Sequence, residues 1–394
     1  MLFNLQLIGI FYFDMEKLMR AVLVLCAATI VCASAFAIES PAEASSNSPA
    51  EAGSSAVKQA IQNTTFGGYV IGKASANNQE GATHSNFELR LVRLYAKGKM
   101  LDFAYNLQMQ VNGIGGSAGE KGPRIVDAWI EWQHWTWARI KFGQMKRAFM
   151  IENPMNPWDI GFGTYSQATS KLSGMSDRCG EHDSNGRDVG VQLQGDLLPS
   201  ARDGHAWVHY QVGLWTGQGI NHADKNSHKD LIGGIGISPV KGLSLNWWGW
   251  NGRYTSSTGI TVDRRRWAAG LQYNGAFTLR GEYVHSYGYK VSDWDAENTA
   301  WKGSAKSQGW YVMAGAPVTR DKKLRIYGKV DAYSDYLHLD YSTTKTIYGI
   351  SAEYWILKNL KLQLNLNQID DNAAEHRGAD GSYSTADLQL YWRF

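Results

Sequence analysis

The stretch STADLQLYWRF (384–394) ends the chain, and its pattern decides the fold. Leu388, Leu390, Trp392 and Phe394 stand at every second position, with polar or amphipathic residues between them. Apolar side chains at a period of two predict a β-strand with one apolar and one polar face. Chain ends are usually frayed and polar, so a strand that continues to the last residue predicts that its edge is paired with another strand.

The same alternation recurs from Phe66 to the end of the chain, interrupted by Gly, Asn, Asp and Ser. In KLQLNLN (361–367), the leucines lie on one face while lysine, glutamine and asparagine lie on the other. Each segment is close to the ~9 to 11 residues that a tilted strand needs to cross a membrane. Sixteen strands are predicted, at 66–77, 86–99, 101–113, 124–134, 136–146, 187–196, 205–217, 229–238, 242–254, 263–274, 276–288, 307–318, 322–335, 345–357, 359–370 and 383–394.

A transmembrane barrel accounts for this pattern better than a soluble β-sandwich, although strands of both alternate. The polar face carries amides and charges around the whole chain, as suits a water-filled lumen. Short and long connections also alternate, as periplasmic turns and outer loops do. Several tryptophans near strand ends fit interfacial girdles, with ordinary core packing as the alternative: Trp247, Trp248, Trp250, Trp355 and Trp392. The sequence therefore predicts an all-β fold, an antiparallel transmembrane barrel of 16 strands.

The residues before the first strand predict a targeting segment followed by a leader. A start at Met15 gives a basic region, an apolar run and an Ala-x-Ala cleavage site that ends at Ala37, as in secretory signal peptides. We expect 1–37 to be a signal peptide; an uncleaved membrane helix is the alternative, but the apolar run is shorter than the ~20 residues of a span. Residues 38–64 are expected to form a flexible periplasmic leader, and 65–394 the barrel domain.

Four stretches carry motifs in a fixed order: FELRLVRLYAKGKM (87–100), VDAWIEW (126–132), KFGQMKRAFMIENP (141–154) and GRDVGVQLQGDL (186–197). They resemble the phosphate-selective porins of the O and P type. That family has an arginine-rich second strand, a D-A-x-x-E strand, a G-Q-x-K-x-x-F segment and an R-x-x-G-V-Q-x-x-G strand. The resemblance implies a trimeric channel in the outer membrane of a Gram-negative bacterium, with a third loop folded into the pore. It also implies a constriction at which arginines bind phosphate, with lysines along the path that leads to it.

The resemblance assigns roles to particular residues and departs from the family at one of them. Arg90 matches the first of the paired arginines on the second strand and Arg93 a later one, whereas Leu91 stands where the second of the pair is found. The loop 158–186 is the candidate for the inward-folded constriction, with an ordinary outer loop as the alternative. Its charged candidates are Lys171, Asp177 and Arg178.

Cations on the polar strand faces are candidates for anion binding. A guanidinium group donates two parallel hydrogen bonds to phosphate, and fixed positive charge in a pore favours anions. Besides Arg90, the alternation places Arg139, Lys141, Arg266, Arg280, Arg325, Lys329, Lys361 and Arg393 on these faces, and Lys146 and Arg147 lie where a strand enters the long loop. The acids Asp127, Glu131, Glu282 and Asp331 share the same faces. A mixed lumen, in which these charges pair with one another, is therefore the alternative.

Other functional classes find little support. The formal net charge of +3 is too small to argue for nucleic acid. His205 and His209 share a strand face without a third ligand, and the glycine-rich 112–122 lacks the spacing of a nucleotide-binding loop. Cys179 is left alone after signal cleavage, so it forms no internal disulfide and carries no catalytic pattern. We expect no catalytic residue, no metal and no cofactor.

The expected function is that of an outer-membrane porin for passive diffusion of small anionic solutes, with phosphate as the candidate solute. A general diffusion porin with weak selectivity is one alternative, and a plugged barrel that acts as an enzyme or adhesin is another. The expected partners are outer-membrane lipid and lipopolysaccharide, small anions such as phosphate, two further copies in a homotrimer, and the barrel assembly machinery through Phe394. The arginines of DRRRW (263–267) would bind lipopolysaccharide phosphates, attract anions or, as we favour, anchor the strand at the interface.

Overall fold

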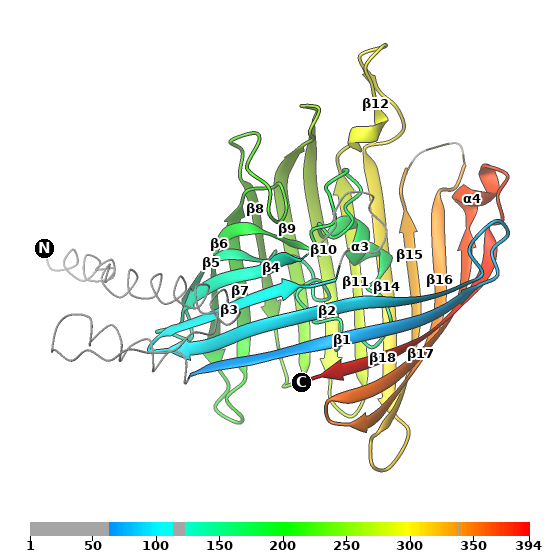
Figure 1. Cartoon of the computed structure of the whole chain (residues 1–394). Helices are drawn as coiled ribbons and strands as arrows, with labels where there is room; N and C mark the ends of the chain where they lie inside the picture. Colours follow the sequence, from blue (N-terminus) through cyan, green and yellow to red (C-terminus); the bar gives the residue numbers. More distant parts are fainter. Residues whose placement is uncertain (1–62, 113–122, 338, 340) are drawn as a thin grey trace, which may run out of the picture.

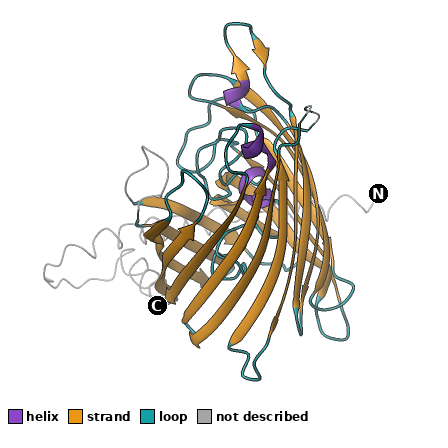
Figure 2. Ribbon diagram, turned by 90° about the vertical axis from the view of Figure 1, so that its right-hand side faces the viewer, coloured by secondary structure: helices purple, strands orange, loops and turns teal. Residues whose placement is uncertain are grey.

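Sixteen antiparallel strands close into one barrel (Figure 1 and Figure 2). The structure, a computed structural model, describes residues 63–112, 123–337, 339 and 341–394; the predicted signal peptide and the leader up to residue 62 lie outside them. The barrel strands are β1 (Thr64–Asn77), β2 (Ser85–Met100), β3 (Phe103–Gln110), β4 (Arg124–Trp132), β5 (Arg139–Lys146), β6 (Arg187–Pro199), β7 (Ala206–Trp215), β8 (Asp230–Ile237), β9 (Leu243–Thr255), β10 (Thr261–Asn274), β11 (Thr278–Tyr287), β14 (Lys306–Pro317), β15 (Leu324–Ser334), β16 (Thr344–Leu357), β17 (Leu360–Asp371) and β18 (Ser382–Arg393).

The predicted fold is confirmed strand by strand. Every predicted segment coincides with one barrel strand, and their ends agree within three residues. The sequence pattern did not predict the small elements in the loops. These are α3 (Gln167–Leu172), η2 (Val291–Asp293), the hairpin β12 (Trp294–Asp295) and β13 (Ala300–Trp301), and α4 (Asn372–His376).

The last strand closes the barrel against the first. β18 pairs with β1 from Tyr69↔Arg393 to Asn77↔Thr385. Phe394 is held by two backbone hydrogen bonds to Gly68, each 3.0 Å long. Leu388, Leu390, Trp392 and Phe394 are each about half exposed on the outer face, whereas Gln389 and Tyr391 are buried inside. The terminal residue is ordered because its strand completes the hydrogen bonding of both edges.

The two ends of the barrel differ in the length of their connections. At one end the strands are joined by short turns, from 101–102 and 358–359 to 318–323. At the other end lie the long connections, including 147–186, 216–229 and 288–305. In outer-membrane barrels the short turns face the periplasm and the long loops face outward. No helix in the described part of the chain is long and apolar enough to cross a membrane.

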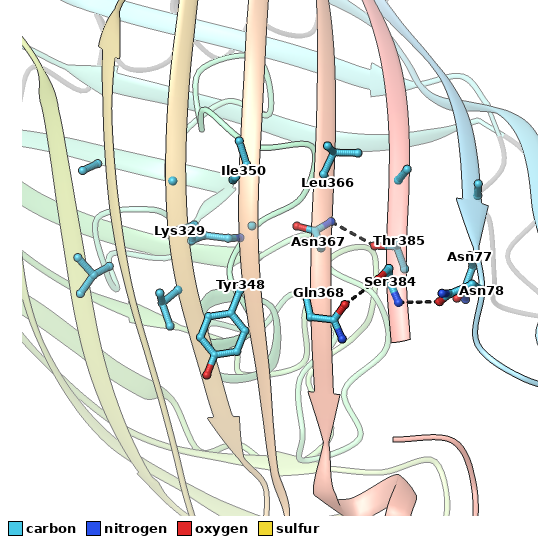
Figure 3. Close-up of a pocket in the computed structure, with 17 residues that line it drawn as sticks. Asn77, Asn78, Lys329, Tyr348, Ile350, Leu366, Asn367, Gln368, Ser384 and Thr385 are labelled. Carbon is cyan, nitrogen blue, oxygen red and sulfur yellow. Dashed lines mark hydrogen bonds between the residues drawn. The ribbon is translucent and has the colours of Figure 1, made fainter. Parts of the chain in front are cut away.

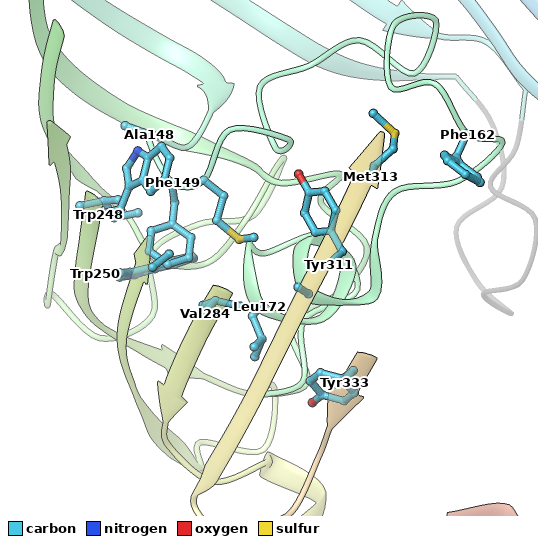
Figure 4. Close-up of a cluster of buried hydrophobic side chains, with 14 of the residues drawn as sticks. Ala148, Phe149, Phe162, Leu172, Trp248, Trp250, Val284, Tyr311, Met313 and Tyr333 are labelled. Carbon is cyan, nitrogen blue, oxygen red and sulfur yellow. The ribbon is translucent and has the colours of Figure 1, made fainter. Parts of the chain in front are cut away.

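One side of the barrel holds a packed apolar cluster. Residues of the segment 147–186 pack there against inner-face side chains of β7 to β11, β14 and β15 (Figure 4). Figure 4 labels ten of its members: Ala148, Phe149, Phe162, Leu172, Trp248, Trp250, Val284, Tyr311, Met313 and Tyr333. Interiors packed in this way exclude water. The inner faces of these strands are therefore not uniformly polar, as strict alternation had suggested.

Candidate functional site

Wall side chains hold the backbone of 147–186. On β11, the Glu282 carboxylate accepts hydrogen bonds from the Glu152 N–H at 3.0 Å and from the Tyr311 hydroxyl at 2.6 Å. On β15, Asp331 accepts from the Gln167 N–H at 2.9 Å, at the start of α3. These carboxylates satisfy backbone donors that would otherwise be unpaired in a buried segment.

The same segment is held from strands farther round the barrel. On β17, the Lys361 ammonium donates to the Trp158 carbonyl at 2.6 Å, and the Asn365 carboxamide accepts from the Gly163 N–H at 3.0 Å. Lys361 also pairs with Glu353 on β16 at 2.6 Å. Side chains of β11, β15 and β17 thus hold the backbone of this segment against the wall.

A buried charge cluster fixes the outer end of this segment. Arg147 contacts Glu181 at 3.0 Å and Asp188 at 2.9 Å, and all three side chains are fully buried. Arg264 on β10 pairs with the same Glu181 and, at 2.7 Å, with Asp230 on β8. Buried charges are tolerated only when they are paired in this way.

A second buried pair lies beside the first cluster. Arg266 donates to both carboxylate oxygens of Asp177, at 2.6 and 2.7 Å. Burial raises the pKa of Asp177, but the ion pair with Arg266 outweighs burial and holds that pKa below its ordinary value. Trp250 lies between the arginines, with the Arg266 guanidinium 4.8 Å from its ring centroid. Arg178 pairs with Asp335 at 3.3 Å.

Several predicted anion-binding residues are therefore already bound to other groups of the chain. The guanidiniums of Arg147 and Arg266 lie on carboxylates, because the loop supplies acids that strand alternation could not place. Arg280 donates to the Ile160 carbonyl at 2.5 Å. The remaining pairs are Lys329 with Asp331 at 3.4 Å and Arg139 with Asp196 at 2.8 Å. Arg325 lies opposite Glu353 in the strand register, and Lys171 is exposed on α3.

A cavity of about 890 Å³ lies on the other side of the barrel, formed mainly by β1 to β6 and the segment 154–159. Its walls are rich in cations. These are Arg93, Lys97, Lys99, Lys141, Lys146, Arg147, Arg187 and Arg393, against the carboxylates Asp127 and Asp159. With Arg147 neutralised by its own carboxylates, seven cations face two acids.

A β-bulge turns both predicted arginines of β2 inward. The register passes from Ile71↔Leu91 to Gly72↔Leu89, so Arg90 has no partner on β1. This extra residue lets Arg90 and Arg93, which are three positions apart, lie on one face. Arg93 donates to the Tyr69 hydroxyl at 3.0 Å, and Arg90 donates to Gln389 at 2.9 Å. Strict alternation would have turned one of them toward lipid.

The bulge also places Leu91 inside the barrel. This residue is buried in a small cluster with Tyr69, Ile71, Trp158 and Tyr391. The resemblance to the phosphate-selective family expected an arginine here. The chain instead has an apolar contact between β2 and the segment 147–186.

A glycine has a comparable effect on β5. Gly143 has φ +125°, and a Cβ there would lie 2.2 Å from the Ala128 carbonyl oxygen. Only glycine fits such a position without strain. The resulting break in alternation brings Lys141 and Lys146, five residues apart, into the same cavity. Lys141 lies 3.7 Å from the centroid of the Trp129 ring.

Arg187 is a cavity residue that the sequence analysis missed. It donates to both carboxylate oxygens of Asp127, each at 2.9 Å, and lies opposite Lys146 in the register. The polar residues Gln192 and Gln194 mark the inner face of β6, so strict alternation turns Arg187 outward. Neither Lys141 nor Lys146 forms an ion pair with any carboxylate of the described residues. Both side chains are partly buried and line the cavity.

Two histidines meet where the segment 147–186 contacts the connection 216–229. The rings of His182 and His222 lie 3.7 Å apart, and both reach the carbonyl of Ile220. Burial, assisted by the neighbouring His222, lowers the pKa of His182 to about 4. The His182 imidazole is therefore uncharged at neutral pH.

The histidines and the cysteine that were considered for catalysis or metal binding show no catalytic arrangement. His205 lies 2.5 Å from Asp203, and His209 lies 2.7 Å from Asp196. Burial raises the pKa of the Cys179 thiol, which disfavours the reactive thiolate. Within the described ranges, no group of three potential ligands could hold a metal ion.

Comparison with solved structures supports the barrel fold. The anion-selective porin from Comamonas acidovorans aligns with TM-score 0.62 and 15% identity over 84% of this chain and 99% of that one. OmpF of Salmonella typhi gives 0.59 and 13%, covering 84% and 98%. The channel DcaP of Acinetobacter baumannii gives 0.58 and 14%, covering 84% and 97%. At these identities the similarity concerns the fold.

A family model decides the assignment. No curated protein sequence matches the chain significantly. The model described as Gram-negative porin matches residues 21–374, which is most of the chain. The predicted porin class and outer-membrane location are thereby confirmed, while the narrower phosphate-selective type stays a prediction. The chain belongs to the Gram-negative porins, the diffusion channels of the outer membrane.

Proposed function

We propose that this porin conducts small anions by passive diffusion through the basic cavity. The observation that carries the proposal is the excess of cations on its walls, where Lys141 and Lys146 form no ion pair with any described residue and lie beside Arg93. In a narrow aqueous pore, fixed positive charge raises the local concentration of anions and repels cations. The fold resembles that of a protein described as an anion-selective porin, which is consistent with this charge.

Phosphate is one candidate among these anions. Arg93 lines the cavity; its other guanidinium nitrogens donate to Tyr69 and Gln110, and its buried Nε has no hydrogen-bond partner among the described residues. A guanidinium and two ammonium groups could together bind a phosphate oxyanion. However, Arg187 is already ion-paired with Asp127, and Leu91 stands in place of one arginine of the expected pair. We therefore propose anion preference as the main property and phosphate preference as a separate question for experiment.

We further propose that the segment 147–186, which contains the predicted constriction loop 158–186, narrows the channel. Its hydrogen bonds to wall residues such as Glu282 and Lys361 support this role. The apolar cluster on β7 to β15 would then leave the cavity near β1 to β6 as the route for solutes. The chain acts in this proposal as a channel and not as an enzyme.

Three further proposals concern the export, the oligomeric state and the membrane assembly of the protein. We propose removal of 1–37 as a signal peptide and a periplasmic leader over 38–64. A homotrimer is supported by the trimeric form described for a Vibrio cholerae outer-membrane protein of similar fold. Phe394, at the end of the closing strand, is the proposed contact with the assembly machinery.

Reversal potentials in planar bilayers under a KCl gradient test the proposal. We expect single-channel currents with chloride preferred over potassium. Equal permeability would support the general diffusion porin instead, and an absence of open channels would support a plugged barrel. Phosphate added at micromolar to millimolar concentration should reduce the chloride current if the cavity binds it. An unchanged current would reject phosphate binding without affecting anion preference.

A further inference from the structure

Aromatic rings, and not carboxylates, contact most cations of the basic cavity. A cation within about 6 Å of a ring centroid is attracted by the π face of that ring. Five cavity cations meet this condition, and none of the five forms an ion pair in the part of the chain that the structure describes. They are Lys97 on Tyr95 at 5.1 Å, Lys141 on Trp129 at 3.7 Å, Lys146 on Tyr165 at 5.1 Å, Arg93 on Tyr69 at 6.0 Å and Arg393 on Trp158 at 4.4 Å.

Lysines elsewhere on the inner wall contact rings and carboxylates together. Lys329 on β15, labelled in Figure 3, lies 4.7 Å from the centroid of the Phe162 ring and also pairs with Asp331 at 3.4 Å. Lys361 lies near three aromatic rings and pairs with Glu353 at 2.6 Å. A ring beside a lysine is therefore common in this barrel, whereas a ring without an accompanying carboxylate distinguishes the cavity.

Lys141 shows this arrangement most clearly. In the register of β4 and β5 it lies directly opposite Glu131, and Trp129 is diagonally adjacent on the same face. Side chains that are directly opposite on one face are close enough to pair, yet Lys141 and Glu131, both among the described residues, form no ion pair. Glu131 is 4% exposed and accepts hydrogen bonds from Gln133 and Gln194. The ammonium of Lys141 thus lies on the ring although an acid is within reach.

The Trp129 ring is itself held in place. It packs against the apolar cluster that fills the other side of the barrel, and it lines the cavity. Because the cluster is tightly packed, the ring has little freedom to follow the movements of a flexible lysine. Trp129 therefore connects a fixed apolar core to a charged group at the solute pathway.

We propose that Trp129 is a positioning residue of the anion pathway, which keeps the Lys141 ammonium at the cavity wall and away from Glu131. The inference rests on the proposed conduction of anions through this cavity. A ring attracts an ammonium group but has no net charge, so the positive charge of Lys141 stays effective toward a passing anion. Contact with Glu131 would instead draw this charge away from the cavity and neutralise it.

Reversal potentials under a KCl gradient near 0.1 M test the proposal, with the wild-type channel recorded in parallel. Trp129→Leu keeps every charge of the cavity, yet it should lower the chloride-to-potassium permeability ratio by roughly two- to threefold, which approaches the effect of one lost charge. Trp129→Met should do the same, whereas Trp129→Phe should keep most of the wild-type ratio because it retains a ring. Trp355→Leu is the matched control. Its ring lies 5.4 Å from Lys361, which Glu353 already neutralises, so the ratio should not change.

A double-mutant cycle with Glu131→Gln separates positioning from a general effect on the pore. Glutamine keeps the length of Glu131 and removes the charge that would attract Lys141. In this background Trp129→Leu should leave the permeability ratio unchanged. An equal decrease in both backgrounds would overturn the proposal, because the ring would then act on the shape of the pore.

Two further outcomes would also overturn this role of Trp129. One is an unchanged ratio in Trp129→Leu, and the other is a decrease in Trp129→Phe as large as that in Trp129→Leu. A wild-type ratio close to one would reject the proposed anion preference itself, and the role of Trp129 with it. The parallel wild-type recording therefore distinguishes failure of the proposed function from failure of the positioning role alone.

Discussion

Neutralising the two unpaired lysines of the cavity should reduce anion preference in a manner that depends on salt. The change is Lys141→Gln together with Lys146→Gln. Both side chains line the cavity without an ion pair to the described residues, and the nearby buried acids keep partners of their own, Asp127 with Arg187 and Glu131 with Arg139. Glutamine keeps much of the length and polarity of lysine. The expected result is therefore a change of charge in an intact pore.

The size of the cavity sets the magnitude. A sphere of about 890 Å³ has a radius of about 6 Å. A unit charge at that distance contributes about 0.7 kcal/mol in water, and screening at 0.1 M salt reduces this to about 0.4 kcal/mol. Two charges act with opposite sign on chloride and potassium, so their permeability ratio should change by about 1.5 kcal/mol, or roughly tenfold. At 1 M salt the same change should be about twofold or less, because the Debye length is only about 3 Å.

Reversal potentials at both salt concentrations provide the measurement. The matched control is Lys322→Gln with Lys323→Gln, which removes two exposed charges from the turn 318–323. The reasoning is refuted if the cavity variant keeps the wild-type ratio at 0.1 M salt. It is equally refuted if the ratio changes by the same factor at 0.1 and 1 M, since that would indicate an altered pore structure and not a lost field.

Further predictions concern stability, measured by urea unfolding in detergent micelles. Gly143→Ala should destabilise the barrel by about 1–3 kcal/mol, because the new Cβ would meet the Ala128 carbonyl at a positive φ; wild-type stability would contradict this account. Arg264→Met should cost about 3–5 kcal/mol, since it leaves two buried carboxylates short of a partner, whereas its exposed neighbour Arg265→Met should cost under about 0.5 kcal/mol. With a pKa of about 4, His182 stays neutral in the folded chain while the unfolded chain gains a proton near pH 6.5. Stability should therefore fall as pH decreases from about 6.5 to 4, and His182→Gln should reduce that dependence; an identical pH profile would exclude His182 as its source.

The strands were predictable because one face of each strand meets lipid. A strand such as β17 must keep its leucines outward along its full length, so apolar residues recur at every second position of the sequence. Closure followed from the same rule, since the apolar positions of β18 continue to Phe394. The alternation of short and long connections also identified the two ends of the barrel.

The cavity could be predicted only in part, because its residues lie where the alternation breaks. Arg90 and Arg93 face inward together through a bulge, and Lys146 faces inward through Gly143. A bulge depends on the partner strand, so no single segment reveals it. Breaks in strand alternation of this kind are common at functional sites, where the position of a functional side chain overrides the regular pattern.

Partners in the long loop were equally hidden from the sequence. The alternation of its strand turns Arg266 toward the pore, and nothing in that strand indicates that Asp177 neutralises its charge. The segment 147–186 has no period that would place its acids against particular strands. Its backbone is instead fixed by scattered side chains such as Glu282 and Asn365. Pore charge therefore had to be counted after pairing and not from composition.

The buried charge cluster is built around arginines, whereas the two cavity cations without an ion pair to the described residues are lysines, and there is a physical reason for this difference. Guanidinium groups are weakly hydrated and donate in a fixed fork, so Arg147, Arg264 and Arg266 can be buried on carboxylates. Ammonium groups are strongly hydrated, and Lys141 and Lys146 line the cavity without an ion pair in the part of the chain that the structure describes. Exchanging arginine for lysine would thus have different effects on the two sides. In the packed cluster it would lose bidentate contacts and stability, whereas in the cavity lysine to arginine would keep the charge, and with it the anion preference.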